Sequence, residues 1–191
     1  MPTPPDFSAL DAHDRIALGF SGGKDSTAVL TMLREAGLLD RVTVYHLDTG
    51  DLLPEMVAHV ARMTAGLPRF EHIQTDVRGW QWQHGLPSDL VPHTQHWIGQ
   101  QMGEGRGTRL VGRYDCCWAN LMAPFFDRVA EDGNTLLIRG TKRADMARLP
   151  ARTGDMAGGV ELLYPLEDWS HDDVRAYLAA RGVELDRKSV V

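Results

Sequence analysis

The sequence predicts an α/β fold: a doubly wound, mostly parallel five-stranded sheet with helices on both faces. Two observations lead to this prediction. Short apolar runs alternate along most of the chain with longer segments of helical spacing, a pattern typical of parallel sheets covered by helices. In addition, the first apolar run ends in a glycine-rich turn that leads directly into a helical segment, as in a β-loop-α unit.

Each expected element follows from local spacing and composition. The apolar run at 15–20 suits a buried strand, and Gly37 is a natural stop for the helix that follows it. β-Branched residues favour a second strand at 41–48. The remaining strands are expected at 70–76, 135–139 and 161–164, and the remaining helices at 55–65, 118–131 and 172–181.

The chain has the size of one ordinary domain. Its 191 residues and 21.2 kDa are enough to bury a core without disulfides or a structural metal. We therefore expect a single α/β domain over residues 1–191. Regular spacing fails between 79 and 113, where glycine and proline recur, so this segment is expected to be a long irregular insertion over the site.

Composition excludes several classes of protein. Hydrophobic residues make up 43% of the chain and charged residues 24%, which is usual for a globular protein and indicates no membrane span. The amino terminus has no basic leader or apolar segment, so a cytoplasmic location is expected. The net charge of -6 argues against a general nucleic-acid binder. The two cysteines, Cys116 and Cys117, are adjacent, which excludes a disulfide framework.

The most informative local pattern is Ser21-Gly-Gly-Lys-Asp-Ser26, between the first expected strand and the first helix. At such a junction, backbone N–H groups and the helix dipole face an incoming anion. Gly22 and Gly23 permit close approach of a phosphate, the serines offer hydroxyl donors, and Lys24 supplies a cation. Asp25 suits a helix cap, a metal ligand or a contact to water. The spacing is not that of a Walker A loop.

This pattern resembles the PP-loop, SGGxDS, of the adenine nucleotide α-hydrolase-like superfamily. Three further segments between Ile16 and Tyr177 resemble the PAPS reductase and ATP sulfurylase branch. Leu47-Asp-Thr-Gly50, followed by Pro54-Glu55, is similar to IDTG…PET. Residues 140–148 are similar to GxRxxES…R, and residues 164–177 to NPLxDWTxxDVxxY.

The basic side chains of the segment at 140–148, together with Arg139 just before it, suit phosphate or sulfate oxygens. A solvated basic turn is the alternative. In the segment at 164–177 we expect an architectural role, with Ser170 capping a helix and Asp173 completing a capping box. The resemblance implies nucleotide binding by Ser21, Gly22, Gly23, Lys24, Asp25, Ser26, Asp48, Thr49, Gly50, Gly140, Lys142, Arg143 and Arg148.

Asp115-Cys-Cys-Trp118 resembles a cysteine pair that reductases of this branch use with a later CxxC to hold a four-iron cluster. No cysteine follows Cys117, and the chain stops at Val191 without the C-terminal cysteine of those reductases. Two thiolates do not complete the usual four-cysteine ligation. The pair is therefore an incomplete cluster site, a redox or sulfur-carrying dithiol, or a structural feature.

The resemblance implies a PP-loop enzyme of sulfur metabolism that takes ATP, APS or PAPS. Its expected catalytic residues are Lys24, Asp25, Cys116 and Cys117. With ATP, adenylyl transfer would release pyrophosphate, with Mg²⁺ at Asp25 and Asp48. With a sulfonucleotide, a thiolate would attack sulfur. The alternative is a non-catalytic nucleotide-binding subunit, and a homodimer or a partner subunit is expected as the assembly.

Two weaker patterns lie in the predicted insertion. His93 and His96 are spaced to meet a ligand if their segment is helical, although surface or capping roles are more usual. Trp80, Trp82 and Trp97 are candidates for stacking on adenine, with core or lid packing as the alternative.

Overall fold

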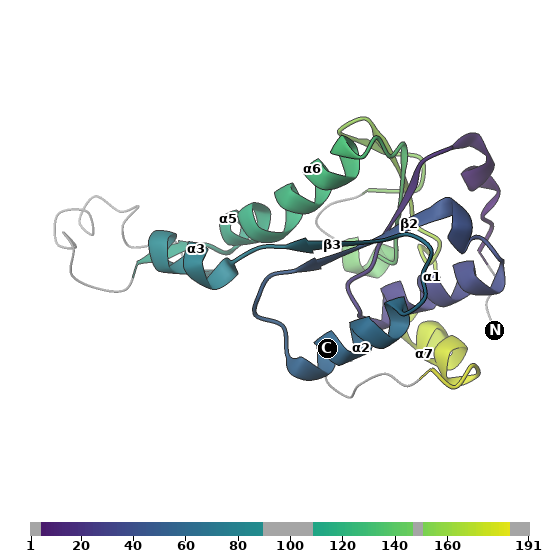
Figure 1. Cartoon of the computed structure of the whole chain (residues 1–191), viewed down its shortest axis with the longest axis horizontal. Helices are drawn as coiled ribbons and strands as arrows, with labels where there is room; N and C mark the ends of the chain where they lie inside the picture. Colours follow the sequence, from purple (N-terminus) through teal and green to yellow (C-terminus); the bar gives the residue numbers. More distant parts are fainter. Residues whose placement is uncertain (1–4, 90–108, 147–150, 184–191) are drawn as a thin grey trace. The chain divides into compact units, whose positions relative to one another are not determined.

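The computed structural model describes residues 5–89, 109–146 and 151–183, in which strands and helices alternate (Figure 1). The strands are β1 (Ile16–Gly19), β2 (Val42–Asp48), β3 (Phe70–Gln74), β4 (Leu86–Ser88), β5 (Leu110–Gly112), β6 (Leu136–Arg139), β7 (Met156–Ala157) and β8 (Val160–Leu163). The α-helices are α1 (Lys24–Glu35), α2 (Pro54–Thr64), α3 (Val77–His84), α5 (Arg113–Cys117), α6 (Ala123–Glu131) and α7 (His171–Ala179). Shorter helical turns are η1 (Ser8–Ala12), η2 (Leu39–Arg41), η5 (Arg143–Met146) and the π-helical η4 (Trp118–Met122).

Six strands form one mostly parallel sheet in the order β3-β2-β1-β6-β8-β7, which confirms the predicted α/β class. β1 pairs in parallel with β2 and β6, and β6 with β8. The count of five strands was wrong by one, because β7 pairs antiparallel with β8. A strand of two residues shows no hydrophobic period. The turn Gly158-Gly159, with positive φ at both residues, is the hairpin signal that identifies it.

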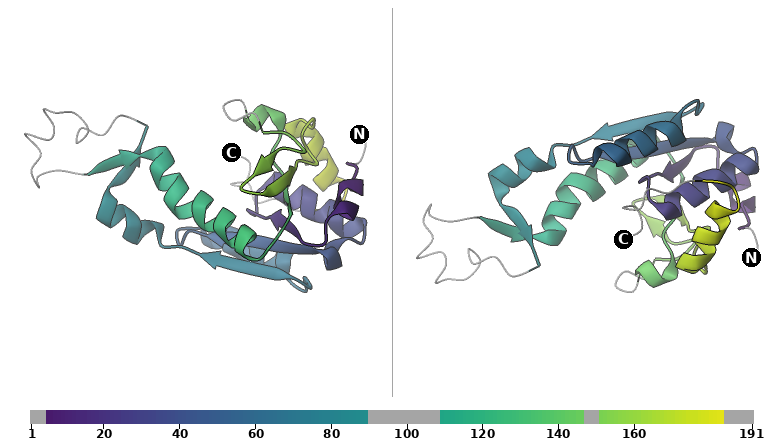
Figure 2. Two further views of the ribbon diagram at one scale, coloured as in Figure 1. Left: turned by 90° about the horizontal axis from the view of Figure 1, so that it is seen from above. Right: turned by 90° about the horizontal axis from the view of Figure 1, so that it is seen from below.

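Helices cover both faces of the sheet, as predicted. Leu18, Val44 and Ile138 are register neighbours on one face, and none is more than 1% exposed. They belong to the main hydrophobic core, to which α1, α2 and α7 contribute on this side (Figure 1). On the other face Ala17 and Leu137 are fully buried, and the last turn of α6 lies over that side (Figure 2).

Two predicted helix ends are confirmed. α1 ends at Glu35, and Gly37 follows with a φ of +69°, a left-handed conformation that glycine adopts without strain. α7 begins after Ser170, whose hydroxyl accepts the N–H of Asp173 while the carboxylate of Asp173 accepts the N–H of Ser170. The predicted capping box is therefore present, and it fixes where the chain enters α7.

The chain divides into two compact units. The first contains the residues up to His46, Leu53–His72 and the residues from Arg128 onward, and the second contains Leu47–Leu52 and Ile73–Asp127. The first unit holds the main core together with β1, β6, β7 and β8. The second holds α3, α5, η4 and a two-stranded parallel sheet of β4 and β5. None of the described helices combines the length and apolar character that a membrane crossing requires.

The segment predicted to be irregular between 79 and 113 is regular at both ends, which corrects the prediction. α3 continues to His84, and β4 and β5 pair in parallel. The Asp76 carboxylate caps α3 by accepting the N–H of Gly79 at 2.8 Å. The composition of 79–113 did not indicate this helix, because its cap, Asp76, lies before that segment and Gly79 stands in its first turn. Residues 90–108 lie outside the described parts of the chain.

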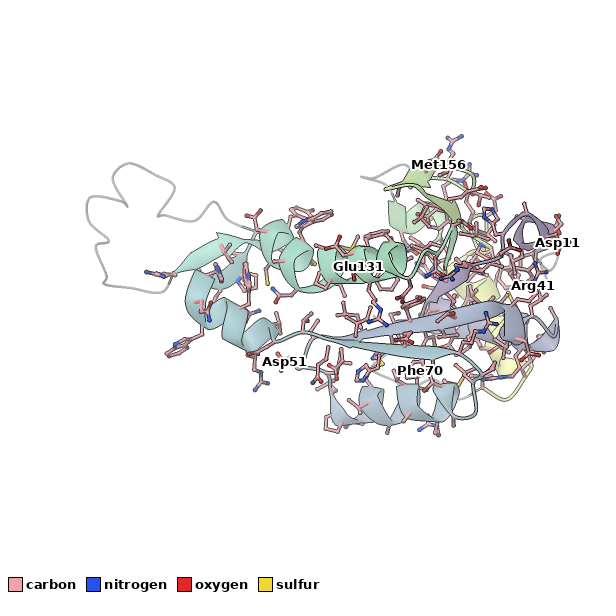
Figure 3. All side chains as sticks on the ribbon, turned by 45° about the horizontal axis from the view of Figure 1, so that its top comes forward. Asp11, Arg41, Asp51, Phe70, Glu131 and Met156 are labelled. Atoms are coloured by element: carbon pink, nitrogen blue, oxygen red, sulfur yellow. The ribbon has the colours of Figure 1, made fainter. Side chains whose placement is uncertain are left out.

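Arg41 binds the N-terminal turn η1 through its side chain. The guanidinium of Arg41 donates to the Asp11 carboxylate at 2.8 Å and to the Leu10 carbonyl at 2.7 Å (Figure 3). Leu10 is fully buried. The arginine thus links η1 to the core, although a pair as exposed as Arg41 and Asp11 contributes at most about 1 kcal/mol.

Candidate functional site

The loop between β1 and α1 is shaped by its first glycine. Gly22 has a φ of +77°, and a Cβ atom there would lie 2.8 Å from Cγ2 of Val60 and 2.9 Å from Sδ of Met56. Both neighbours belong to α2, which therefore backs the loop. A side chain at position 22 would strain the backbone and collide with α2. The packing of the loop on α2 alone is enough to require glycine here.

The amide end of α1 opens onto the loop. α1 begins at Lys24 with Gly23 as its N-cap, and no side chain accepts a hydrogen bond from the first turn. The N–H groups of that turn have no carbonyl partner within the helix. The Oγ atoms of Ser21 and Ser26 lie 3.1 Å apart, beside these amides. Hydroxyls and uncapped amides therefore converge at one point, an arrangement that binds phosphate or sulfate.

Four charged side chains form a row next to the loop, which we call the charged row. The Nζ of Lys24 lies 3.1 Å from Oδ2 of Asp25, and the Nζ of Lys142 lies 2.7 Å from the same oxygen. The Nζ of Lys142 also lies 3.0 Å from Oδ2 of Asp145. Signs alternate along the row in the order Lys24, Asp25, Lys142, Asp145, so its formal charges cancel.

Burial differs along the charged row. Lys142 is 0% exposed and Lys24 is 8% exposed. A buried ammonium is costly unless it is paired, and Lys142 has a carboxylate on either side. Burial raises the pKa of Asp145, but the hydrogen bonds and charge of Lys142 outweigh it and hold that pKa below its usual value. Asp145 is therefore ionised at neutral pH and balances Lys142.

Gly140 brings the end of β6 against the first turn of α1. A Cβ atom at Gly140 would lie 2.7 Å from the carbonyl carbon of Asp25 and 2.8 Å from the nitrogen of Ser26. Both are backbone atoms, which cannot yield without unwinding the start of α1. Two residues further on, Lys142 reaches the Asp25 carboxylate. The two predicted residues Gly140 and Lys142 thus meet the loop in the structure.

The other basic residues of the 140–148 segment are placed differently. Arg143 is exposed, with NH2 3.2 Å from the Glu167 carboxylate and 3.0 Å from that of Asp168. Arg139 is half-buried beside Tyr164: burial raises the pKa of the Tyr164 phenol, and the charge of Arg139 opposes that shift. Arg148 lies outside the described residues. Nucleotide contacts from Arg143 and Arg148 stay predictions.

Comparison with known proteins agrees with this geometry. Residues 15–96 match the family model described as the phosphoadenosine phosphosulfate reductase domain, and the match includes the loop Ser21–Ser26. This match agrees with the resemblance of these residues to the PAPS reductase branch of the PP-loop superfamily. The crystal structure of PAPS reductase from Candida auris, a phosphate complex, is similar with a TM-score of 0.60, over 91% of this chain and 75% of that one. Sequence identity is 14%, so this likeness supports the fold. No curated protein matches the chain by sequence.

Within the matched residues 15–96, the segment Asp48-Thr49-Gly50 forms a turn of the second unit. Oδ1 of Asp48 accepts the N–H of Gly50 at 2.7 Å, and the Asp48 carbonyl accepts the N–H of Thr75 at 2.9 Å. The N–H of Val77 donates to the Thr49 carbonyl at 3.1 Å. The segment therefore has a structural role as a turn after β2. Its contact with a nucleotide stays a prediction.

The two cysteines, also in the second unit, differ in their surroundings. Cys116 is 6% exposed, and its Sγ lies 3.8 Å from Nε2 of Gln81 and 3.8 Å from Nδ2 of Asn120. Cys117 is exposed. Neighbours in a helix point about 100° apart, so the two sulfurs do not share a face. Within the described ranges, no three metal-ligating side chains gather. The pair does not fit a four-ligand iron–sulfur cluster.

Sequence reasoning missed the partners that support the loop. Asp145 was assigned no role from the sequence, yet its spacing of three residues from Lys142 is the signal that the two can pair within one turn. Met56 and Val60 had no signal, because their role depends on how α2 packs. Of the tryptophans, Trp80 stacks on His84 at 4.4 Å between ring centroids, and Trp82 is 91% exposed. Trp97, His93 and His96 fall in the part of the chain left undescribed.

Proposed function

We propose that the loop Ser21–Ser26 binds the phosphate groups of an adenine nucleotide, either ATP, APS or PAPS, and that the protein acts in sulfur metabolism. The observation that carries the proposal is the convergence of uncapped α1 amides, two serine hydroxyls and the Lys24 ammonium. Such groups bind tetrahedral oxyanions well. Gly22 and Gly140 hold this arrangement from two sides, through α2 and β6.

The carboxylates that the sequence suggested for Mg²⁺ are each engaged through one oxygen, while Oδ1 of Asp25 is buried without a hydrogen-bond partner in the described parts of the chain. Oδ2 of Asp25 contacts two ammonium groups, and Oδ1 of Asp48 accepts a backbone N–H. Mg²⁺ would need such oxygens for its octahedral shell. Lys24 and Lys142 already occupy Oδ2 of Asp25, which favours APS or PAPS over a nucleotide that needs Mg²⁺.

The reaction that we propose is reduction of the sulfonucleotide. A thiolate attacks the sulfur of the sulfo group, an S–S bond forms, and the S–O bond breaks as the nucleotide phosphate leaves with the electron pair. A second thiol, from an external dithiol reductant, then attacks the first sulfur, releases sulfite and forms a disulfide. Of the two cysteines, Cys117 is exposed and is the candidate for the first thiolate.

A nucleotide-binding subunit is the second candidate function. The first unit supplies the loop with cations and hydroxyls, whereas both cysteines belong to the second unit. A partner that supplies the reacting group would agree with this division. Binding of nucleotide without turnover is the outcome that separates this candidate from the enzyme.

Calorimetric titration with ATP, APS and PAPS, with and without Mg²⁺, tests the binding proposal. We expect Lys24→Met to weaken binding about tenfold to hundredfold, because a charge-assisted contact is lost. Arg175→Met is the matched control, since Arg175 is an exposed cation of α7 paired with Asp172. Binding that is absent in the unaltered protein, or equal in Lys24→Met, would contradict the proposal.

Turnover assays identify the reaction. Sulfite formed from APS or PAPS with a dithiol reductant, and lost in Cys117→Ser, supports reduction. Pyrophosphate formed from ATP would support adenylyl transfer instead. Tight binding with neither product points to the subunit.

A further inference from the structure

We propose that Lys142 is a positioning residue of the nucleotide site: by holding the Asp25 carboxylate, it leaves the ammonium of Lys24 available to the bound phosphate. This inference rests on the proposed binding at Ser21–Ser26. It assigns Lys142 a role through Asp25 and Lys24, whereas the sequence pattern suggested a direct contact with the nucleotide.

The first support is competition for a single oxygen. Oδ2 of Asp25 lies 2.7 Å from Nζ of Lys142 and 3.1 Å from Nζ of Lys24. Attraction between charges rises as their distance falls and as water is excluded. Lys142 is both nearer and more deeply buried than Lys24. By distance and burial Lys142 exerts the stronger electrostatic attraction on Asp25, while the Lys24 contact is the one with hydrogen-bond geometry.

The second support is the fixed position of Lys142. The backbone N–H of Lys142 donates to Oδ2 of Asp145 at 3.1 Å, and its Nζ lies 3.0 Å from the same oxygen. Gly140 packs on the backbone of Asp25 and Ser26, just before this turn. The ammonium is thus set in place before any ligand arrives, which is what a positioning group requires.

The third support is the charge balance. The charged row has two cations and two anions. Without Lys142, two carboxylates would face one ammonium at the start of α1, and Asp25 would pair with Lys24 alone. An incoming phosphate would then meet a Lys24 whose charge is neutralised by Asp25, in a charged row of net negative charge. Its affinity should fall although every group proposed to touch it is still present.

Two double variants with equal net charge separate positioning from net charge. Asp25→Asn/Lys142→Met removes the carboxylate that captures Lys24, whereas Lys142→Met/Asp145→Asn keeps it. Each changes the charged row by one anion and one cation. The probe is inorganic pyrophosphate, titrated by calorimetry into the full chain, with thermal melting to confirm that each variant is folded.

We expect Lys142→Met to bind pyrophosphate about tenfold more weakly, as when one charge-assisted contact is lost. Asp25→Asn/Lys142→Met should return to within about threefold of the unaltered protein, and Lys142→Met/Asp145→Asn should stay about tenfold weak. Lys142→Arg keeps the charge and should bind well. If Lys142→Met fails to fold, the two double variants and Lys142→Arg carry the test, because neutral replacement of buried pairs is tolerated.

The outcomes are distinguishable. Equal affinities for the two double variants would overturn the positioning role and leave nucleotide binding intact, as would a folded Lys142→Met with unchanged affinity. If the unaltered protein binds neither pyrophosphate nor any of the three nucleotides, the proposed function fails, and the inference fails with it.

Discussion

The two ends of the strands in the first unit make a useful contrast. We call the side of the sheet at their carboxyl ends the loop edge, and the side at their amino ends the cavity edge. At the carboxyl end of β1 lies the loop, with α1 amides that no side chain caps. At the amino ends of the strands lies a cavity of about 590 Å³. Glu131, at the end of α6, is among its lining residues (Figure 3). The others are Asp14, Arg15, Ile16, Thr43, Tyr45, Arg69, Glu71, Asp132 and Asn134.

Several polar groups of this cavity pair with one another or with Arg128. The Tyr45 hydroxyl donates to Oδ2 of Asp132 at 2.9 Å and accepts from Nδ2 of Asn134 at 2.8 Å. Arg128 donates to both Asp132 and Glu71 at 2.8 Å. Polar groups that are paired in this way have less to offer a ligand than the first-turn amides of α1, which no side chain caps. Unsatisfied donors therefore identify the candidate site better than volume does.

The largest effect is expected at the loop edge, from Gly140→Ala. The new Cβ would press on the backbone of Asp25 and Ser26. We expect pyrophosphate binding to weaken at least about a hundredfold and unfolding free energy to fall by about 1–3 kcal/mol, as for an overpacked site. Calorimetry and urea unfolding measure both. Gly154→Ala is a comparison in open space, although its φ of +92° adds strain of its own. Binding unchanged in Gly140→Ala would show that the loop tolerates displacement.

At the cavity edge, Tyr45→Phe is expected to cost about 1–2 kcal/mol of stability, because Asp132 and Asn134 each lose a partner. Pyrophosphate affinity should stay unchanged, since the cavity is not the proposed site. Altered affinity with normal folding would break the contrast between the two edges.

Tyr45→Phe should also change how the free energy of unfolding depends on pH. Burial, with the neighbouring Asp132 and Glu71 charges, raises the pKa of Tyr45 to about 12, although the hydrogen bond from Asn134 opposes the shift. In the unfolded chain a tyrosine ionises at about pH 10. The unfolded state therefore loses its proton first, and the stability contributed by Tyr45 is present below that pH and lost as pH rises toward the folded value. Urea unfolding at alkaline pH should show this loss in the unaltered protein and a smaller one in Tyr45→Phe.

The smallest effect is expected far from both edges, at the capping box of α7. Ser170→Ala removes the acceptor of the Asp173 N–H and should cost about 1 kcal/mol. Ser8→Ala is the control, because the Ser8 hydroxyl donates to an exposed carboxylate of Asp6. Thermal melting compares the two. Equal shifts would show that the cap contributes nothing specific.

Features whose determinants are local could be predicted from the sequence. The alternation of strands and helices, the stop at Gly37 and the capping box at Ser170 all depend on residues a few positions apart. The loop could be placed because its residue types match anion binding at a strand–helix junction. The position of Lys142 could not, because burial of its ammonium depends on Asp25, more than a hundred residues earlier. A basic residue in a turn was expected to face solvent or ligand.

The short elements at 77–88 and 156–157 were missed for a different reason. α3 depends on a single side-chain cap, and β7 depends on pairing with β8 rather than on its own composition. Periodicity needs several residues to show itself. Elements this short are defined by their partners, which a single sequence does not display.

The burial of the two lysines of the charged row also bears on ionic strength. Dissolved ions screen exposed charges within about 10 Å at 0.1 M salt, but screen buried charges much less. Lys142 is buried against the partly buried Asp25 carboxylate, whereas Arg143 presents its charge at the surface. The field that the protein itself sets up at the start of α1 should therefore persist at salt concentrations that cancel the attraction of the surrounding surface.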